Sequence, residues 1–148
     1  MTKLVKFNYQ HRPFIYLQFQ DNPITDENFE EYKREYLELL LTCKKQKDKI
    51  IPIIDINFLP ILPIPYMMKQ TQMNKELFQI HKKYLYRVYI YCKNRIFQEM
   101  IQMYMFVEKT AVPIHICNSF QNIDASILKE EERIFQSAIM IENKKEEV

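Results

Sequence analysis

The fold is decided by residues 49–65, which read KIIPIIDINFLPILPIP. Their first half (49–56) is a short, nearly continuous aliphatic run, which is typical of a strand buried on both faces of a sheet. Three prolines then follow within six residues, and they exclude regular structure because each fixes φ and lacks a backbone donor. Pro65 suits the first turn of a helix, and apolar residues at helical spacing extend that helix to about residue 84. This stretch therefore predicts a buried strand, an irregular apolar loop and a helix.

The sequence on either side supplies the remaining elements. Alternating apolar residues at 4–10 and 14–20, with the short HRP connection between them, predict an antiparallel hairpin. Helical spacing begins after Thr25 or Asp26, either of which can cap a helix, and Asn94 can cap another. Beyond the hairpin, the predicted elements are helices at 26–46, 95–108 and 121–141 and strands at 86–92 and 112–117.

The resulting element order is β-β-α-β-α-β-α-β-α. Strands that alternate with helices require right-handed crossovers and parallel neighbours, whereas the hairpin makes the first strand antiparallel. The sequence thus predicts an α/β fold with a five-stranded, mixed but mostly parallel sheet and helices packed on it. Its 148 residues suit one domain with a substantial core, and we expect residues 142–148 to form a solvated tail.

Three segments carry a resemblance to a known family. They read IIPIIDINFLPI (50–61), RVYIYCKNRIFQEMIQMY (87–104) and VPIHICNSFQNIDASIL (112–128). With this element order over residues 3–141, the chain resembles the STAS domain, the fold of the bacterial anti-sigma-factor antagonist SpoIIAA. It is also similar to the SpoIIAA-like relatives grouped near the CRAL-TRIO lipid-binding domains. The resemblance implies a small α/β module used for protein contacts or for binding a ligand, and no particular chemistry.

One departure from the family pattern matters for function. STAS phosphoswitches carry an Asp-Ser-Ser-Gly-like motif after the third strand, in which a serine is phosphorylated. The corresponding stretch here is Pro60–Pro65, and neither serine nor threonine occurs between Lys44 and Gln70. The phosphoswitch therefore does not carry over to this sequence.

The complete absence of glycine excludes several classes of enzyme. P-loops, dinucleotide-binding turns, nucleophile elbows and EF-hand loops all need glycine for a positive φ or a close backbone approach. We accordingly expect no cofactor, and turns in which no residue has a positive φ. The most apolar stretch (50–68) is no membrane span, because its prolines, Asp55 and Asn57 would leave polar or charged groups in lipid.

Charge and cysteine usage bear on partners and compartment. The formal net charge is only +2, so the chain as a whole implies no electrostatic partner. Cys43, Cys92 and Cys117 form neither an even set nor a C-x-x-C pair, which favours free thiols in a reducing compartment. We therefore expect a cytoplasmic protein without a disulfide framework.

Two cysteine-based sites are geometrically conceivable. His115 and Cys117 share one face of their strand, and Cys92 lies on the neighbouring strand. Together these three side chains could supply part of the ligand set of a zinc ion. Cys117 also precedes the last helix, as the nucleophile of a hydrolase can. A buried cysteine ordinarily behaves as a small hydrophobic residue, which argues against both sites. The zinc site also lacks a fourth ligand, and the hydrolase would need backbone donors from a loop that contains no glycine. We expect neither a metal site nor a catalytic cysteine.

Two further candidates have ordinary structural explanations. Asp55 could act as a general base in a dry pocket, but a carboxylate at the end of a strand more often caps the following loop. The basic run from Lys82 to Arg95 is interleaved with tyrosines on which bases could stack. Two of these, Tyr89 and Tyr91, fall in a central strand, so we expect a core role and no nucleic-acid binding.

The proline-rich loop is the better candidate for function. Its apolar side chains cannot all turn inward from so short an irregular segment, and exposed apolar patches usually mark contacts. The carboxyl ends of parallel strands share one edge, where this loop joins the loops at 20–25, 92–95 and 117–121. The residues predicted to contact a partner there are Leu59, Leu62, Ile64, Tyr66, Lys93, Arg95 and Asn118.

These observations predict a non-enzymatic protein–protein interaction module, or a small subunit of a larger assembly, that docks through this edge. The alternative, by analogy with the CRAL-TRIO relatives, is a small-molecule or lipid-binding domain with an apolar pocket under the same edge. The sequence alone leaves open a third interpretation, in which the loop has only a structural role and packs against its own helices.

Overall fold

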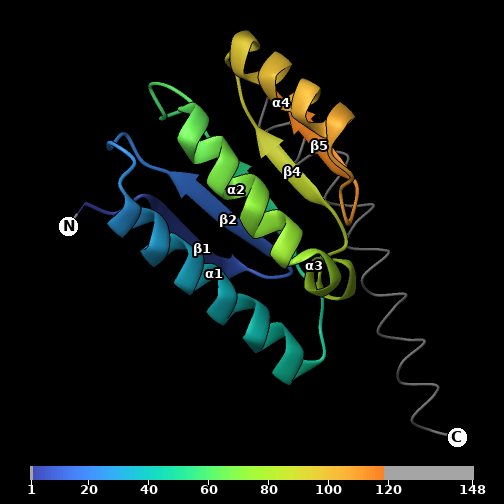
Figure 1. Ribbon diagram of the computed structural model, residues 1–148. Coiled ribbons are helices and arrows are strands. Elements are labelled where there is room, and N and C mark those ends of the chain that lie inside the picture. Colours follow the sequence, from blue (N-terminus) through green and yellow to red (C-terminus); the bar gives the residue numbers. More distant parts are fainter. Residues whose placement is uncertain (1, 119–148) are drawn as a thin grey trace, which may run out of the picture.

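The computed structural model describes residues 2–118 (Figure 1). The predicted helix at 121–141 and the predicted tail at 142–148 lie outside these residues. The strands are β1 (Val5–His11), β2 (Phe14–Phe19), β3 (Ile51–Asp55), β4 (Val88–Tyr91) and β5 (Ile114–Cys117). The helices are α1 (Asp26–Gln46), α2 (Ile64–Glu76), α3 (Phe78–Tyr84) and α4 (Arg95–Val107). None of these helices is long and apolar enough to cross a membrane.

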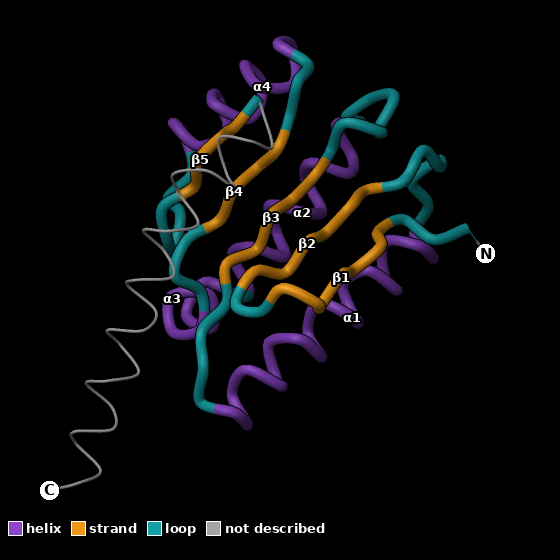
Figure 2. The backbone as a smooth tube through the Cα atoms, turned by 180° about the vertical axis from the view of Figure 1, so that it is seen from behind, coloured by secondary structure: helices purple, strands orange, loops and turns teal. Residues whose placement is uncertain are grey.

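The five strands form one mixed sheet in the order β1-β2-β3-β4-β5. β1 is antiparallel to β2, and the other neighbours are parallel. This arrangement confirms the predicted α/β class and the mixed, mostly parallel sheet. Because the strands follow chain order and parallel crossovers are right-handed, the four helices lie on one face of the sheet, as the view from behind shows (Figure 2).

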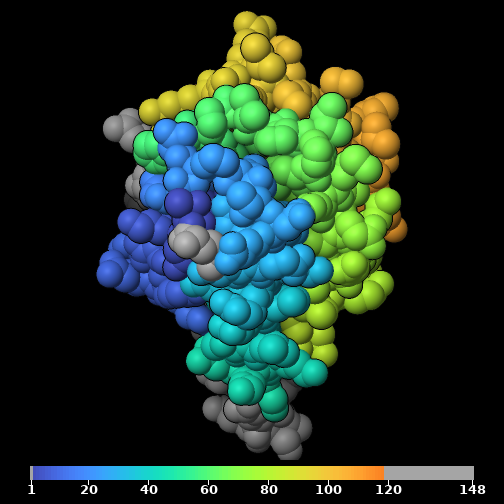
Figure 3. Space-filling view, turned by 60° about the vertical axis from the view of Figure 1, so that its left-hand side comes forward, coloured from blue at the N-terminus to red at the C-terminus, as the bar shows by residue number. Residues whose placement is uncertain are grey.

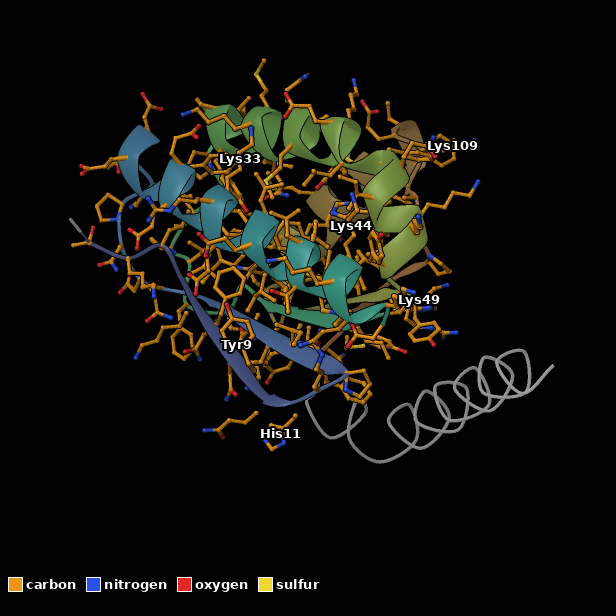
Figure 4. All side chains as sticks on the ribbon, turned by 90° about the horizontal axis from the view of Figure 1, so that it is seen from below. Tyr9, His11, Lys33, Lys44, Lys49 and Lys109 are labelled. Carbon is orange, nitrogen blue, oxygen red and sulfur yellow. The ribbon has the colours of Figure 1, made fainter. Side chains whose placement is uncertain are left out.

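The main core lies between the helical layer and the sheet, which are separate in the view from below (Figure 4). Ile15, Leu17 and Phe19 of β2 point into it, as their alternation predicts. The residues that α1 buries are Asn28, Phe29, Tyr32, Tyr36, Leu39, Leu40 and Cys43. Because of their helical spacing, these residues form one face of α1, and this face packs over the β1–β2 half of the sheet.

A smaller apolar cluster lies on the opposite face of the sheet. It contains Phe14, Ile51, Ile53 and Tyr89, all buried. Ile51 and Ile53 alternate along β3 with residues that point to the helices, so β3 is buried on both faces, which confirms the interpretation of its aliphatic run.

The helix predicted between Pro65 and residue 84 is broken in the structure. At Leu77 the backbone leaves the helical conformation (φ −97°, ψ 8°), and α3 begins at the next residue. Leu77 is buried and keeps the apolar spacing of the stripe. The periodicity therefore passes through the break without revealing it.

The expectation that no residue has a positive φ is wrong at Lys47. This residue ends α1 in the left-handed conformation (φ 54°, ψ 43°), and its N–H donates to the Cys43 carbonyl. Asp48 N–H reaches the same carbonyl at 3.2 Å. A left-handed residue after a helix satisfies its last carbonyls, and lysine fills that position here because the chain has no glycine.

Candidate functional site

Asn57 holds together the loops that follow β3 and β4. Its side-chain oxygen accepts a hydrogen bond from the Lys93 backbone N–H (2.7 Å), and its amide nitrogen donates to the Tyr91 carbonyl (3.4 Å). On the next strand, the Cys92 N–H donates to the Cys117 carbonyl (2.9 Å). The ends of β3, β4 and β5 thus form one connected edge, at which the predicted contact residues can be placed.

The structure divides the seven predicted contact residues into a buried and an exposed group. Leu59 and Tyr66 are only 4% and 8% exposed and belong to the main core, and Leu62 packs half-buried against it. Leu59 and Tyr66 therefore anchor the loop from inside. The exposed members of the prediction are Ile64, Lys93, Arg95 and Asn118.

Further apolar side chains face outward around Ile64. Phe58, Ile61, Ile64 and Met68 are 55%, 63%, 70% and 68% exposed, and we call these four residues the loop patch. Sequence reasoning left Phe58 out because the prolines at 60 and 63 interrupt the periodicity from which a side chain's direction is inferred. It counted Met68 in the apolar stripe of the following helix, whereas the structure exposes this side chain. At the same end of the sheet, the beginning of α4 (yellow in Figure 3) projects and exposes Ile96.

Asp55 is a buried carboxylate whose two oxygens both accept hydrogen bonds. Oδ1 accepts from the backbone N–H and the side-chain amide of Asn57 (2.9 and 2.8 Å), and Oδ2 accepts from the Tyr16 hydroxyl. Burial and the adjacent carboxylate raise the pKa of Tyr16 well above its ordinary value, so it remains a donor. This geometry supports the loop-capping explanation of Asp55 over a general base.

The residues of the conceivable metal site do not converge. Cys92 points into the main core, whereas Cys117 packs against the cluster on the opposite face, where His115 stacks on Tyr89 (ring centroids 5.4 Å). Between residues 2 and 118, no three His, Cys, Asp or Glu side chains form a group that could hold a metal ion. Burial raises the pKa of the Cys117 thiol, which is the opposite of what a nucleophile needs.

The basic run from Lys82 to Arg95 is not a continuous surface. Lys82 and Lys83 lie near the end of α3, whereas Lys93 and Arg95 follow the opposite end of β4. Tyr89 lies between them and is buried. Tyr86 and Tyr91 are partly buried and pack against the cluster that contains Tyr89.

A cavity of about 200 Å³ lies between the sheet and the helical layer, and residues of all four helices line it. Its mouth carries Lys75 and Glu108, whose ammonium and carboxylate groups are 3.8 Å apart, and Lys109, which lies beside α3 (Figure 4). Leu85 and Val112, which precede β4 and β5, line the same side. The lining thus runs from the amino ends of these strands to Ile56, Leu62 and Tyr66, which follow the carboxyl end of β3, the edge under which the sequence analysis expected a pocket.

A buried histidine–tyrosine pair lies in the wall of this cavity. The Tyr36 hydroxyl and His81 Nε2 are 2.7 Å apart, and both side chains are buried. Burial lowers the pKa of His81 to about 4, so the imidazole is neutral at physiological pH. No sequence pattern pointed to this pair, because its members are 45 residues apart and belong to different helices.

Comparison with known proteins shows the fold and no closer relationship. No family model matches the sequence, and no curated protein matches it. Among solved structures, the chain is similar to an uncharacterized protein from the DUF3478 family with a SpoIIAA-like fold, from Shewanella loihica PV-4. The TM-score is 0.54 at 13% sequence identity, and the match covers 80% of this chain and 87% of that one. The chain therefore has a SpoIIAA-like α/β fold, as the resemblance to STAS domains implied.

Proposed function

We propose that this protein is a non-enzymatic interaction module, acting alone or as a small subunit of a larger assembly. It docks to a protein partner through the carboxyl edge of its sheet. The observation that carries this proposal is the loop patch, in which four large apolar side chains are more than half exposed within eleven residues. Such a concentration of exposed apolar surface is typical of contact sites.

The loop beneath the patch is suited to docking because it is anchored. Leu59 and Tyr66 hold it in the core, and Asn57 ties its start to the Lys93 backbone. An anchored loop loses little conformational entropy on binding, so more of the apolar contact energy contributes to affinity. A purely structural role, in which the loop only packs against its own helices, explains the burial of Leu59 and Tyr66. It does not explain why the loop patch is exposed.

The charges beside the patch indicate the kind of partner. Lys93 and Arg95 are exposed at the same edge, and Arg95 Nε lies 3.6 Å from the carboxylate of Glu99, which is also exposed. We therefore expect an apolar segment flanked by acidic residues, such as an amphipathic helix of another protein. The three cysteines are free thiols, which supports a reducing, cytoplasmic location.

Photo-crosslinking at position 61 tests this proposal. The photoreactive residue p-benzoylphenylalanine replaces Ile61 in one sample and Leu41 in the matched control, an exposed apolar residue of α1 away from the patch. We expect a discrete crosslinked protein in extract of the source organism at position 61 only. With that protein purified, the double variant Ile61→Asp/Ile64→Asp should bind at least about tenfold more weakly in calorimetry, because central apolar contacts dominate interface energy.

The controls distinguish a specific docking surface from one that associates non-specifically. Leu41→Asp should bind the partner like the unmodified protein. Equal crosslinking at positions 41 and 61, or unchanged affinity of the double variant, would overturn the proposal. Crosslinks to a second copy of the same chain would instead identify the patch as a self-association surface.

A further inference from the structure

The cavity between the sheet and the four helices is apolar over most of its wall. Its apolar lining includes Phe19, Ile54, Ile90, Ile101, Tyr104 and Met105. It exists because α4 packs loosely: Phe97 is the one buried residue of this helix, and Ile101 remains partly buried beside the open space. Protein interiors are ordinarily close-packed, so a cavity of this size needs an explanation.

A chain of uncharged polar groups runs along one wall. The Gln70 side-chain oxygen accepts from the Tyr32 hydroxyl (3.1 Å), and its amide nitrogen donates to the Asn74 side-chain oxygen (2.9 Å). Asn74 lines the cavity, and within residues 2–118 no acceptor is hydrogen-bonded to its amide nitrogen. That nitrogen carries two hydrogens, so the wall offers a donor to a ligand.

Charge is kept to the mouth of the cavity. Lys75, Glu108 and Lys109 stand there, with the Lys75–Glu108 ion pair joining the end of α2 to the end of α4. The interior histidine, His81, is neutral and bonded to Tyr36. A charged ligand group inside would lose its hydration without an opposite charge to replace it, so the interior favours an uncharged molecule.

The volume limits the size of the ligand. A cavity of about 150 Å³ lined by apolar residues holds a benzene molecule, whereas sites for larger ligands span about 300 to 1,000 Å³. At about 200 Å³, this cavity holds one six-membered ring with a substituent, and a long-chain lipid of the kind the CRAL-TRIO analogy implies does not fit.

We propose that this cavity is a binding site for a compact, uncharged molecule of about one ring, carrying a single oxygen that accepts a hydrogen bond from Asn74. Phenols, cyclic alcohols and cyclic ketones have this chemistry. The site shares no residue with the loop patch, although Leu62, Tyr66 and Met67 of its lining come from the same segment of the chain. Methionine signals report the occupation of the cavity and crosslinking at position 61 reports docking, so the two are measured separately.

Methionine methyl groups provide internal probes for the test. Met67 and Met105 line the cavity, whereas Met68 and Met103 are exposed. The full chain is labelled with methyl-¹³C methionine and titrated separately with cyclohexanone and cyclohexane, followed by NMR. We expect saturable shifts of the Met67 and Met105 methyl signals with both probes, and negligible shifts at Met68 and Met103.

Two variants decide whether the cavity and its donor are responsible. Ala111→Phe fills the space and should abolish the saturable shifts. Asn74→Leu should weaken cyclohexanone by about twofold to tenfold, the equivalent of one neutral hydrogen bond, without weakening cyclohexane. If Ala111→Phe fails to fold, the comparison of inner and outer methionines in the unmodified chain still decides the matter.

The opposite results would overturn the site. Shifts that do not saturate, or that are as large at Met68 and Met103, would show non-specific association. Unchanged binding in a folded Ala111→Phe variant would place the ligand elsewhere. Equal effects of Asn74→Leu on both probes would remove the oxygen-accepting part of the proposed chemistry.

Discussion

Lys47 occupies a backbone conformation that proteins ordinarily give to glycine. Its φ of 54° brings its side chain close to the backbone, at a cost of about 1 kcal/mol for a residue with a Cβ. The helix accepts that cost because the conformation directs two N–H groups, those of Lys47 and Asp48, to the carbonyl of Cys43. The absence of glycine is therefore not an absence of the conformations that favour it.

Replacing Lys47 with glycine should stabilise the protein. The variant Lys47→Gly removes the steric cost at this position, and we expect the free energy of unfolding to rise by up to about 1 kcal/mol in urea titration. The matched control is Lys45→Gly, two residues earlier within the last helical turn, which should lower it by about 1 kcal/mol. Destabilisation by both variants to the same extent would contradict the argument.

Single residues also mark the limit of prediction from sequence. The loop-capping role of Asp55 was one of two readings, and it followed from chemistry alone, since a carboxylate after a strand meets the N–H groups of the next turn. The outward direction of Ile61 and the inward direction of Leu59 did not follow, because both lie in an irregular proline-rich loop. Their directions depend on the helices over which the loop passes.

Among the elements, the loop after β3 depends most on one side chain. Asn57 makes hydrogen bonds to Asp55, to the Tyr91 carbonyl and to the Lys93 N–H, and so links β3 to the loop that precedes α4. Asn57→Ala leaves the Lys93 N–H and part of the buried Asp55 carboxylate without these partners. We expect the free energy of unfolding to fall by about 2 kcal/mol in urea titration.

A comparison with another asparagine tests whether this link is specific. Asn22 makes one exposed hydrogen bond to the Lys3 carbonyl (2.8 Å), so Asn22→Ala should cost less than about 1 kcal/mol. Faster amide hydrogen exchange at Lys93 should accompany Asn57→Ala and not Asn22→Ala. Equal losses of stability, with unchanged exchange at Lys93, would show that Asn57 does not hold the two loops together.

The elements themselves could largely be predicted, for physical reasons that differ between them. α1 was evident because it buries one face against the sheet and so keeps a helical period from Phe29 to Cys43. The sequence does not reveal the break between α2 and α3, because Leu77, the residue at the break, is apolar and buried. The apolar stripe therefore continues through it. Periodicity reports which face is buried, and it does not report a change in the helix axis.

At the scale of the whole molecule, one buried histidine makes stability depend on pH. Burial lowers the pKa of His81 from 6.5 to about 4, so the unfolded chain binds a proton at a pH at which the folded protein does not. The contribution of neutral His81 is therefore fully present above about pH 6.5 and is lost as the pH falls toward 4. The difference corresponds to up to about 3 kcal/mol in the free energy of unfolding.

Urea titrations between pH 7.5 and 4 check this dependence. His81→Gln keeps a hydrogen-bonding side chain next to Tyr36 but does not titrate, so its stability should fall less over this range than that of the unmodified protein. His11→Gln, at an exposed histidine on the hairpin (labelled in Figure 4), should keep the full dependence. Parallel curves for all three proteins would contradict the role of His81.

The cavity could not be predicted from the sequence, because it depends on how the helices meet the sheet. Residues from all four helices and from the sheet line it, and they lie between Phe19 and Ile114 in the chain. Each apolar residue among them, taken singly, is typical of an ordinary core position. The loose packing of α4 leaves space between them. The amphipathic pattern of a helix shows which face is buried, and it does not show how tightly that face packs.

The strand order has a consequence for how the chain is made. Within residues 2–118, every strand from β2 onward pairs with the strand that precedes it in the sequence, and no strand is inserted between two others. A chain that leaves the ribosome from its N-terminus can therefore add each strand to the growing sheet as soon as it emerges, without waiting for a later segment. The β1–β2 hairpin, emerging first, provides the template, and synthesis and folding of residues 2–118 can advance in the same direction.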